Sequence, residues 1–188
     1  SVCCGRPLLI AGKEKAAQLL IEKNKEMIDR SGAQVLVTSC PICYKAFTEE
    51  YKLDIPVVHH SAFINELIQK GRLSVKNSEQ RVVYHDPCEL GRGSKIYDQP
   101  RSVLEATSKL IPMRKHTHED SLCCGGSLGQ LSLTLEQKDK ISRDALKTYL
   151  NKKPVTLVTA CPLCKKTFNK HAEVPVKDIA EVVCESLN

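Results

Sequence analysis

Short apolar runs alternate along the chain with longer segments in which apolar residues recur every three or four positions. The runs 34–38, 81–85 and 155–159 are rich in valine and leucine, as is typical of strands buried on both faces of a parallel sheet. Segment 13–30 has the spacing of an amphipathic helix, and segment 130–150 is largely helical in pattern, with residues 132–135 ambiguous. This alternation predicts an α/β fold whose helices cover mainly parallel sheets.

Shorter segments of both kinds fill the rest of the chain. Gly32 ends the first long helix in a position typical of a left-handed cap, and Pro41 opens the next one. The other expected elements are helices at 41–51, 61–70, 100–110, 162–170 and 178–187, strands at 55–58 and 174–176, and a loop through 91–94.

The chain contains an internal repeat. The sequence VLVTSCPIC at 35–43 returns as TLVTACPLC at 156–164. Two related three-layer units of Rossmann-like type are therefore expected in tandem. We predict a first unit at 1–77 and a second at 78–188, divided near a polar linker. The first unit lacks a counterpart of the strand and cysteine at 82–88, so we expect that part of it lies upstream of this sequence.

The cysteines follow the same repeat. Cys123 and Cys124 are adjacent and precede two glycines, Cys88 lies 34 residues before them, and a Cys-Pro-Leu-Cys motif begins 36 residues after them. The first unit has the same pattern without its first member. The motif cysteines are Cys88, Cys123, Cys124, Cys161 and Cys164 in the second unit, and Cys3, Cys4, Cys40 and Cys43 in the first. Only Cys184 stands outside the motif, and we expect it to be a small buried side chain on a helix.

The motif cysteines are expected at the carboxyl ends of strands, where helices or glycine loops begin. Such positions gather at one edge of a parallel sheet, so cysteines that are far apart in the sequence can meet there. Helix N-termini offer free N–H groups and positive partial charge, which stabilise thiolates. Five thiolates exceed the four of a zinc site or an ordinary cubane. They indicate either bridging ligation in an unusual iron–sulfur cluster or one cysteine with a separate redox role.

Composition narrows the choice of chemistry. The chain has 188 residues, a formal charge of +6 and ten cysteines. A secreted disulfide scaffold usually has a short, loop-rich chain, whereas this one has long helical patterns, so metal or redox chemistry is favoured. Aromatic residues make up 4% and tryptophan is absent, which argues against nucleic acid as a partner. The positive charge instead suits an acidic partner or an anionic cofactor.

Several other residues near the motifs have both a functional and an ordinary interpretation. Arg92, Lys165 and Lys166 are near enough in sequence to offset thiolate charge, but they are equally typical of a solvated surface. His85 is a candidate neighbour of the cluster or a buried, hydrogen-bonded histidine. His59 and the adjacent His60 are candidates for helix capping or for metal ligation.

These motifs resemble the cysteine-rich CCG domain over essentially the whole chain. The likeness rests on the cysteine pattern and on the stretches 85–92, 97–101 and 121–126. That domain occurs in the B and D subunits of heterodisulfide reductase and in iron–sulfur subunits of glycolate oxidase, lactate-utilisation and anaerobic glycerol-phosphate dehydrogenase systems. The resemblance implies an oxidoreductase component whose second-unit cysteines bind a non-cubane 4Fe–4S cluster. It also implies electron relay from a flavoprotein, or reduction of a disulfide substrate.

Further expectations follow from the same resemblance. The implied partners are a flavoprotein, a ferredoxin-type iron–sulfur subunit and a membrane cytochrome subunit, and the implied location is cytoplasmic or peripheral at the inner face of the membrane. The four first-unit cysteines are expected to hold an iron–sulfur cluster in a longer chain, or zinc. Glu89 stands where many relatives have histidine, so no role of that histidine carries over. The alternatives are a zinc-stabilised interaction domain and a dithiol redox protein with glutaredoxin-like CPxC motifs.

Overall fold

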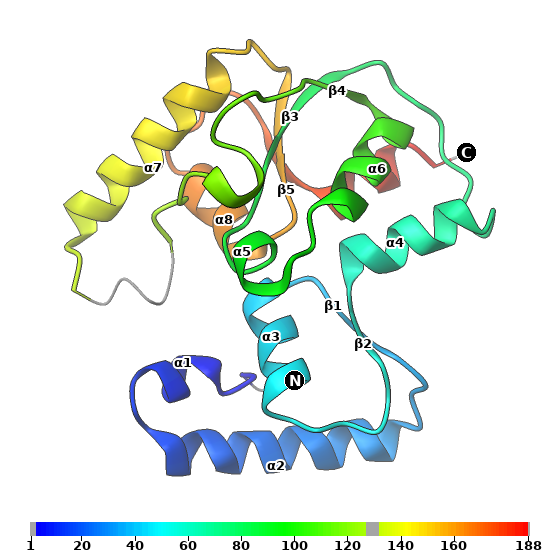
Figure 1. Ribbon diagram of the computed structural model, residues 1–188, viewed down its shortest axis with the longest axis vertical. Helices are drawn as coiled ribbons and strands as arrows, with labels where there is room; N and C mark the ends of the chain where they lie inside the picture. The colour runs from blue at the N-terminus through cyan, green and yellow to red at the C-terminus, as the bar shows by residue number, and fades with distance from the viewer. Residues whose placement is uncertain (1–2, 127–131, 188) are drawn as a thin grey trace.

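Two parallel sheets organise the computed structural model, which describes residues 3–126 and 132–187 (Figure 1). A small sheet pairs β1 (Leu36–Thr38) with β2 (Val57–His59). A larger sheet has the strand order β4-β3-β5-β6, and each of these neighbouring pairs is parallel. Its strands are β3 (Arg81–His85), β4 (Lys109–Leu110), β5 (Thr156–Thr159) and β6 (Val176–Asp178). The mixed α/β class with parallel sheets is as expected.

Helices cover both faces of the larger sheet, because side chains alternate in direction along each strand. On one face, Val82 and Tyr84 pack in a core with residues of α6 (Asp98–Thr107) and α9 (Ile179–Glu185). On the other face, Val83 packs in a second core with residues of α7 (Leu135–Leu150) and α8 (Pro162–Phe168). Every residue of β5 is buried, which explains its continuous apolar pattern.

Local sequence signals account for where these helices begin. Thr134 caps α7 and forms a capping box with Gln137, and Asp178 does the same for α9 with Glu181. The helices α3 (Pro41–Glu49) and α8 both open on the proline of a CPxC motif, as expected from the fixed φ angle of proline.

The first part of the chain packs on a smaller core. Here α1 (Arg6–Ile10) and α2 (Glu14–Ser31) pack with α3, and Ile21, Ala46 and Tyr51 are buried between them. Figure 1 shows α2 as the long helix at the bottom of the molecule. Gly32 caps α2 with a φ of 63°, the left-handed conformation that the sequence predicts.

Residues up to 77 are called the first half below, and residues from 78 onward the second half. The two halves meet where the strands of each sheet give way to helices. His59 caps α4 (His60–Gln69), and the His60 Nε2 atom lies 3.0 Å from Asp178 Oδ1, at the cap of α9. The two capping residues, His59 and Asp178, are equivalent positions in the two repeats, since residues 55–65 align with 174–184. Both histidines are buried, so this junction is part of the interior.

Several boundaries differ from those expected. The segment 91–94 forms a helical turn, α5 (Gly91–Ser94), and α6 begins two residues before Pro100. Lys109 and Leu110 form the edge strand β4 because they pair with β3, which no local pattern signals. The strand expected at 174–176 is shifted to Val176–Asp178. Of the helix expected at 130–150, residues 130 and 131 lie outside the described residues, and α7 begins only at Leu135.

Candidate metal centre

All five motif cysteines of the second half come together beyond the carboxyl ends of the central strands. Cys88 follows β3, Cys161 follows β5, and Cys123 and Cys124 lie between η1 (His118–Asp120) and α7. In the sheet order, β4 and β5 lie on opposite sides of β3. The chain therefore leaves β3 toward β4 on one side and leaves β5 toward β6 on the other side. The space between these two connections is a topological switch point, where open α/β sheets form binding crevices.

Contacts between thiols link these five residues into one continuous chain. Cys123 lies within hydrogen-bond reach of both Cys88 and Cys124, and Cys164 lies within reach of both Cys124 and Cys161. Cys124, Cys161 and Cys164 are buried, whereas Cys88 and Cys123 are partly exposed. Cysteines separated by up to 76 positions in the sequence thus form one group, and four of them, Cys88, Cys124, Cys161 and Cys164, line one cavity.

The thiols differ in acidity because of these contacts. The pKa of Cys88 is raised mainly by its thiol hydrogen bond to Cys123, and to a lesser extent by burial. Donation to Cys123 also raises the pKa of Cys124, to about 12, although the hydrogen bond from Cys164 opposes this change. Hydrogen bonds from the Cys164 thiol and from backbone N–H groups at the start of α8 lower the pKa of Cys161. This helix N-terminus therefore favours a thiolate, as the sequence predicts.

Two glycines bring the backbone close to the sulfurs. The Gly125 N–H donates to Cys123 Sγ and the Gly126 N–H donates to Cys124 Sγ, both at 3.4 Å. A Cβ atom at Gly125 would lie 2.4 Å from the Lys138 carbonyl oxygen, and one at Gly126 would lie 2.3 Å from Thr167 Oγ1. Side chains are therefore excluded at both positions, and the amides remain aimed at sulfur.

The four cysteines of the first half form a second group. Cys43 lies within hydrogen-bond reach of both Cys4 and Cys40, and Cys3 lies within reach of Cys4. Accepting the hydrogen bond from Cys43 lowers the pKa of both Cys4 and Cys40 to about 6. Backbone amides of Ile42 and Cys43, at the start of α3, also donate to Cys40. This repeats the arrangement at Cys161 and α8.

The two cysteine groups are neighbours in space. The charge of a Cys40 thiolate opposes the lowering of the Cys161 pKa, so the two CPxC motifs lie within electrostatic reach of each other. The middle residues of both motifs, Ile42 and Leu163, line one small cavity together with Cys88 and Cys124. Each group is therefore built beside the other, at the junction of the two halves.

Ionic and polar contacts hold the loops that carry the second group. Asp86, two residues before Cys88, is buried and accepts both Nη1 and Nη2 of Arg101, at 2.8 and 2.7 Å. It also accepts the Thr117 hydroxyl and the His118 N–H. Local patterns did not reveal this network, although both HDPC and YDQPR lie in the stretches that resemble the CCG domain. It ties β3, α6 and the approach to Cys123 together.

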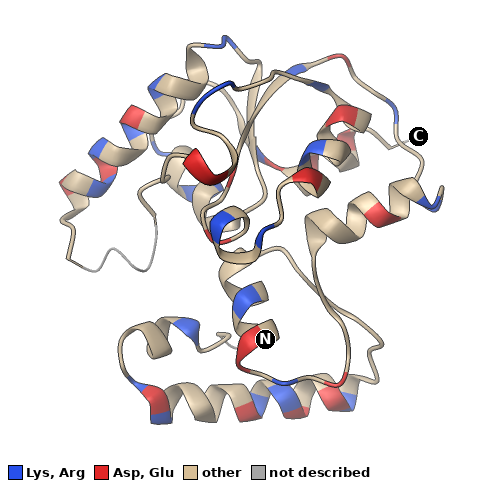
Figure 2. Ribbon diagram, in the orientation of Figure 1, with Lys and Arg blue, Asp and Glu red and all other residues tan. Residues whose placement is uncertain are grey.

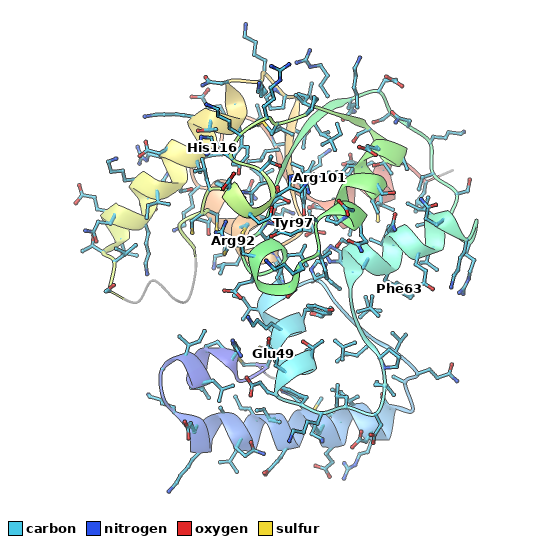
Figure 3. The ribbon with its side chains drawn as sticks, viewed as in Figure 1. Glu49, Phe63, Arg92, Tyr97, Arg101 and His116 are labelled. Atoms are coloured by element: carbon cyan, nitrogen blue, oxygen red, sulfur yellow. The ribbon has the colours of Figure 1, made fainter. Side chains whose placement is uncertain are left out.

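Arg92 has a related positioning role. Its Nη1 atom donates to the carbonyl oxygens of Glu119 and Ser121, at 2.9 and 2.8 Å. Figure 3 shows Arg92 and Tyr97 close together around α5, with Arg101 above them on α6. Arg92 therefore contacts the chain just before Cys123, and its charge acts on carbonyl groups of this loop.

Other candidate residues have ordinary surroundings. Lys165 pairs with Glu181 at 2.5 Å. Acidic and basic side chains are interspersed along α2 and α7 (Figure 2). The prediction that Cys184 is buried was wrong, because it is exposed on α9. Its aligned position in the first half is Asn65, so the motif gave no information about its burial. All ten cysteines are free thiols.

Comparison with known proteins identifies the family of the chain. The family model of the cysteine-rich CCG domain matches residues 1–48 and 82–169, which include all nine motif cysteines. The chain belongs to the CCG family. The family resemblance proposed from the sequence is thereby confirmed.

Relatives of this CCG chain carry names from iron–sulfur and redox chemistry. A probable membrane-anchored ferredoxin of Chromohalobacter salexigens is 34% identical over 94% of the chain. An EtfAB:quinone oxidoreductase of Syntrophomonas wolfei and the D subunit of the dihydromethanophenazine:CoB–CoM heterodisulfide reductase of Methanosarcina barkeri are each 29% identical over 98% of it. The chain spans 29%, 28% and 49% of the length of these three proteins. The family is thus one of iron–sulfur oxidoreductase subunits.

Within residues 3–126 and 132–187, no helix is both long enough and apolar enough to cross a bilayer.

Proposed function

We propose that this chain is the redox module of an oxidoreductase and that its second cysteine group binds a non-cubane 4Fe–4S cluster. The ligands in this proposal are Cys88, Cys123, Cys124, Cys161 and Cys164. The observation that carries the proposal is the unbroken chain of thiol contacts through all five residues. A tetrahedral zinc site uses four ligands, and this group has one more than that.

The surroundings of the group fit a sulfur-ligated, anionic cofactor. When bound, such a cluster supplies one-electron redox chemistry at a potential that hydrogen bonds and burial adjust. The Gly125 and Gly126 amides donate to two of the sulfurs, and the N-terminus of α8 stabilises the thiolate of Cys161. Ile42, Pro87 and Leu163 line the apolar side of the cavity and limit the access of water.

We infer that the electrons come from a flavoprotein partner. The proposal draws on the Syntrophomonas relative, which is named an EtfAB:quinone oxidoreductase. A ferredoxin-type subunit and a membrane cytochrome are the other candidate partners, in keeping with the membrane-anchored ferredoxin among the relatives. The partly exposed Cys88 and Cys123 mark the side from which an electron can enter or leave.

The first group has four cysteines and is assigned separately. Cys3, Cys4, Cys40 and Cys43 provide the number of thiolates that a closed zinc site requires. A cluster with five cysteine ligands would need one more cysteine from outside these residues. We therefore propose zinc for the first group in this stretch of chain, with an iron–sulfur cluster as the alternative in a longer chain.

Disulfide reduction is a second candidate function. It needs two electrons and two protons for each disulfide cleaved to two thiols. Support comes from the proximity of the two cysteine groups at Cys40 and Cys161 and from the heterodisulfide reductase relative. Turnover of a small disulfide by the isolated chain, with a chemical reductant, distinguishes this activity from electron relay.

Cluster binding can be tested by anaerobic reconstitution with iron and sulfide. The wild-type protein is expected to bind iron and acid-labile sulfide in equal amounts. Cys88→Ser and Cys161→Ser are expected to lose most of both, because each removes a ligand at one end of the thiol chain. Cys184→Ser is the matched control, since this cysteine is exposed and outside both groups. Bound zinc without sulfide in the second group would favour the structural alternative instead.

A further inference from the structure

His85 is buried beside the second cysteine group. It is the last residue of β3, it is 1% exposed, and its ring lies on the face of the sheet that α7 and α8 cover. Tyr149 and Phe168 contact the ring edge-on, with centroids 5.5 and 4.8 Å away. One ring nitrogen lies within 4.8 Å of the sulfurs of both Cys124 and Cys164. The His85 ring thus borders the pocket that these thiols form.

The two ring nitrogens have different surroundings. Nδ1 lies 3.0 Å from the Tyr149 hydroxyl. Nε2 is fully buried and has no hydrogen-bond partner among the described residues. A buried nitrogen without a partner is costly, so a partner is expected to occupy the space that Nε2 faces. Because Tyr149 already engages Nδ1, Nε2 is the ring nitrogen that is available to the neighbouring sulfurs of Cys124 and Cys164.

The tautomer follows from the contacts of Tyr149. The backbone N–H of Leu122 faces the Tyr149 oxygen as a donor, which favours donation of the hydroxyl hydrogen to His85 Nδ1. A neutral imidazole that accepts at Nδ1 carries its hydrogen at Nε2. The hydrogen-bond chain from Leu122 through Tyr149 therefore presents an N–H group to the cysteine pocket.

We propose that His85 donates a hydrogen bond from Nε2 to a sulfur of the iron–sulfur centre and thereby raises its reduction potential. This inference rests on the proposed function. A hydrogen bond to sulfur stabilises the reduced, more negative state more than the oxidised state, so the potential moves upward. Tyr149 acts as a positioning residue that fixes the tautomer and the orientation of the ring.

Ligation of the metal by His85 is the competing assignment. It requires a bare Nε2, and Nδ1 would then donate its hydrogen to the Tyr149 oxygen. That oxygen already faces the Leu122 N–H as a donor, so the hydroxyl hydrogen of Tyr149 would have no acceptor among the described residues. The existing hydrogen bonds therefore favour a donor over a ligand.

The test measures the midpoint potential of the reconstituted protein by a titration monitored by electron paramagnetic resonance, together with iron and sulfide content. His85→Leu removes the donor, His85→Gln keeps an N–H group of similar reach, and Tyr149→Phe removes only the hydroxyl. Tyr84→Phe is the matched control. It deletes a buried hydroxyl from the neighbouring residue of β3, on the opposite face of the sheet.

The expected result is an unchanged iron and sulfide content in every variant, with a more negative potential in His85→Leu. A smaller shift in the same direction is expected in Tyr149→Phe, partial recovery in His85→Gln, and no shift in Tyr84→Phe. If His85→Leu and Tyr149→Phe lost iron while Tyr84→Phe kept its iron content, His85 would be identified as a metal ligand and the assignment as a hydrogen-bond donor would be overturned. If His85→Leu does not fold, an unchanged potential in Tyr149→Phe overturns it. A wild-type protein that takes up no iron overturns both proposals, whereas normal iron content with an unchanged potential overturns this one alone.

Discussion

At the scale of single residues, the second cysteine group depends on positions where a side chain is absent. Gly125 has a φ of 85° and lies against the backbone of α7, so it meets both a conformational and a steric requirement. Its amide is also one of the two that donate to sulfur. The glycines after the cysteine pair are therefore part of the binding geometry.

The steric requirement at Gly125 can be separated from the conformational one. Gly71 also has a positive φ, 65°, but a Cβ atom there would have no neighbouring atom within 4 Å. Gly71→Ala is expected to lower the free energy of unfolding by about 1 kcal/mol, the strain of a left-handed alanine. Gly125→Ala is expected to lower it by a further ~1–3 kcal/mol, because the Lys138 carbonyl must move. Urea unfolding of the two variants measures the difference, and equal losses would contradict the steric argument.

The cysteines were the residues that sequence alone predicted best. Their spacing and their place after strands, read with the rule for parallel sheets, were enough to predict that residue 88 meets residues 123, 124, 161 and 164. The position of His85 Nε2 was not predictable in this way. It depends on which face of β3 the ring occupies and on a hydrogen bond to Tyr149, 64 residues away.

At the scale of elements, the ends of strands and helices are tied together by one buried ion pair. Asp86 and Arg101 make a bidentate contact, and the Asp86 side chain is 2% exposed. Thr117 and His118 complete the acceptor contacts of this carboxylate. The network connects the loop of Cys88 with the segment that leads to Cys123.

Removal of the carboxylate should therefore affect stability and metal binding together. Asp86→Ala is expected to lower the free energy of unfolding by about 3–5 kcal/mol, because it leaves the Arg101 charge without its buried partner. Iron uptake should fall as well, since two ligand-bearing segments lose their anchor. Chemical unfolding and iron analysis measure both effects.

Asp144→Ala is the control for this prediction. It removes an exposed carboxylate that pairs with Lys140 on the surface of α7, where ion pairs contribute little. Its unfolding curve and its iron content should match those of the wild type. An Asp86→Ala protein that also matched the wild type would show that the network does not hold the loops.

Helices and strands were predictable from the sequence where burial of one or both faces produces a regular apolar pattern along a run of residues. The strands β3 and β5 and the helices α2 and α7 have such runs, and their patterns predicted them. The two-residue strand β4 and the four-residue turn α5 are too short to have a pattern. They form because neighbouring segments are already in place, which is tertiary information.

At the scale of the whole molecule, the two halves share a buried polar junction. His59 is completely buried at the cap of α4, next to His60, which contacts Asp178 of the other half. Burial, together with the charge of His60, lowers the pKa of His59 to about 3. The junction that places the two cysteine groups side by side therefore contains a histidine that stays neutral in the folded state.

This histidine makes the folded state sensitive to acid. In the unfolded chain its pKa is about 6.5. Below that pH the unfolded state binds a proton that the folded state does not bind until about pH 3. The contribution of His59 to the free energy of unfolding is therefore fully present above pH 6.5. It declines as the pH falls, by about 1.4 kcal/mol for each pH unit. From pH 6.5 to pH 5, His59 is expected to account for a loss of about 2 kcal/mol.

Substitution of His59 by asparagine should reduce this loss, because asparagine can still cap α4 but binds no proton. The comparison is the free energy of unfolding at pH 7, 6 and 5 for wild type, His59→Asn and His116→Asn. His116 is an exposed histidine far from the junction (Figure 3), and its variant should keep the dependence of the wild type. A His59→Asn protein with the same slope as wild type would mean that His59 is reached by protons in the folded state. The two halves would then separate at this junction more readily than its burial indicates.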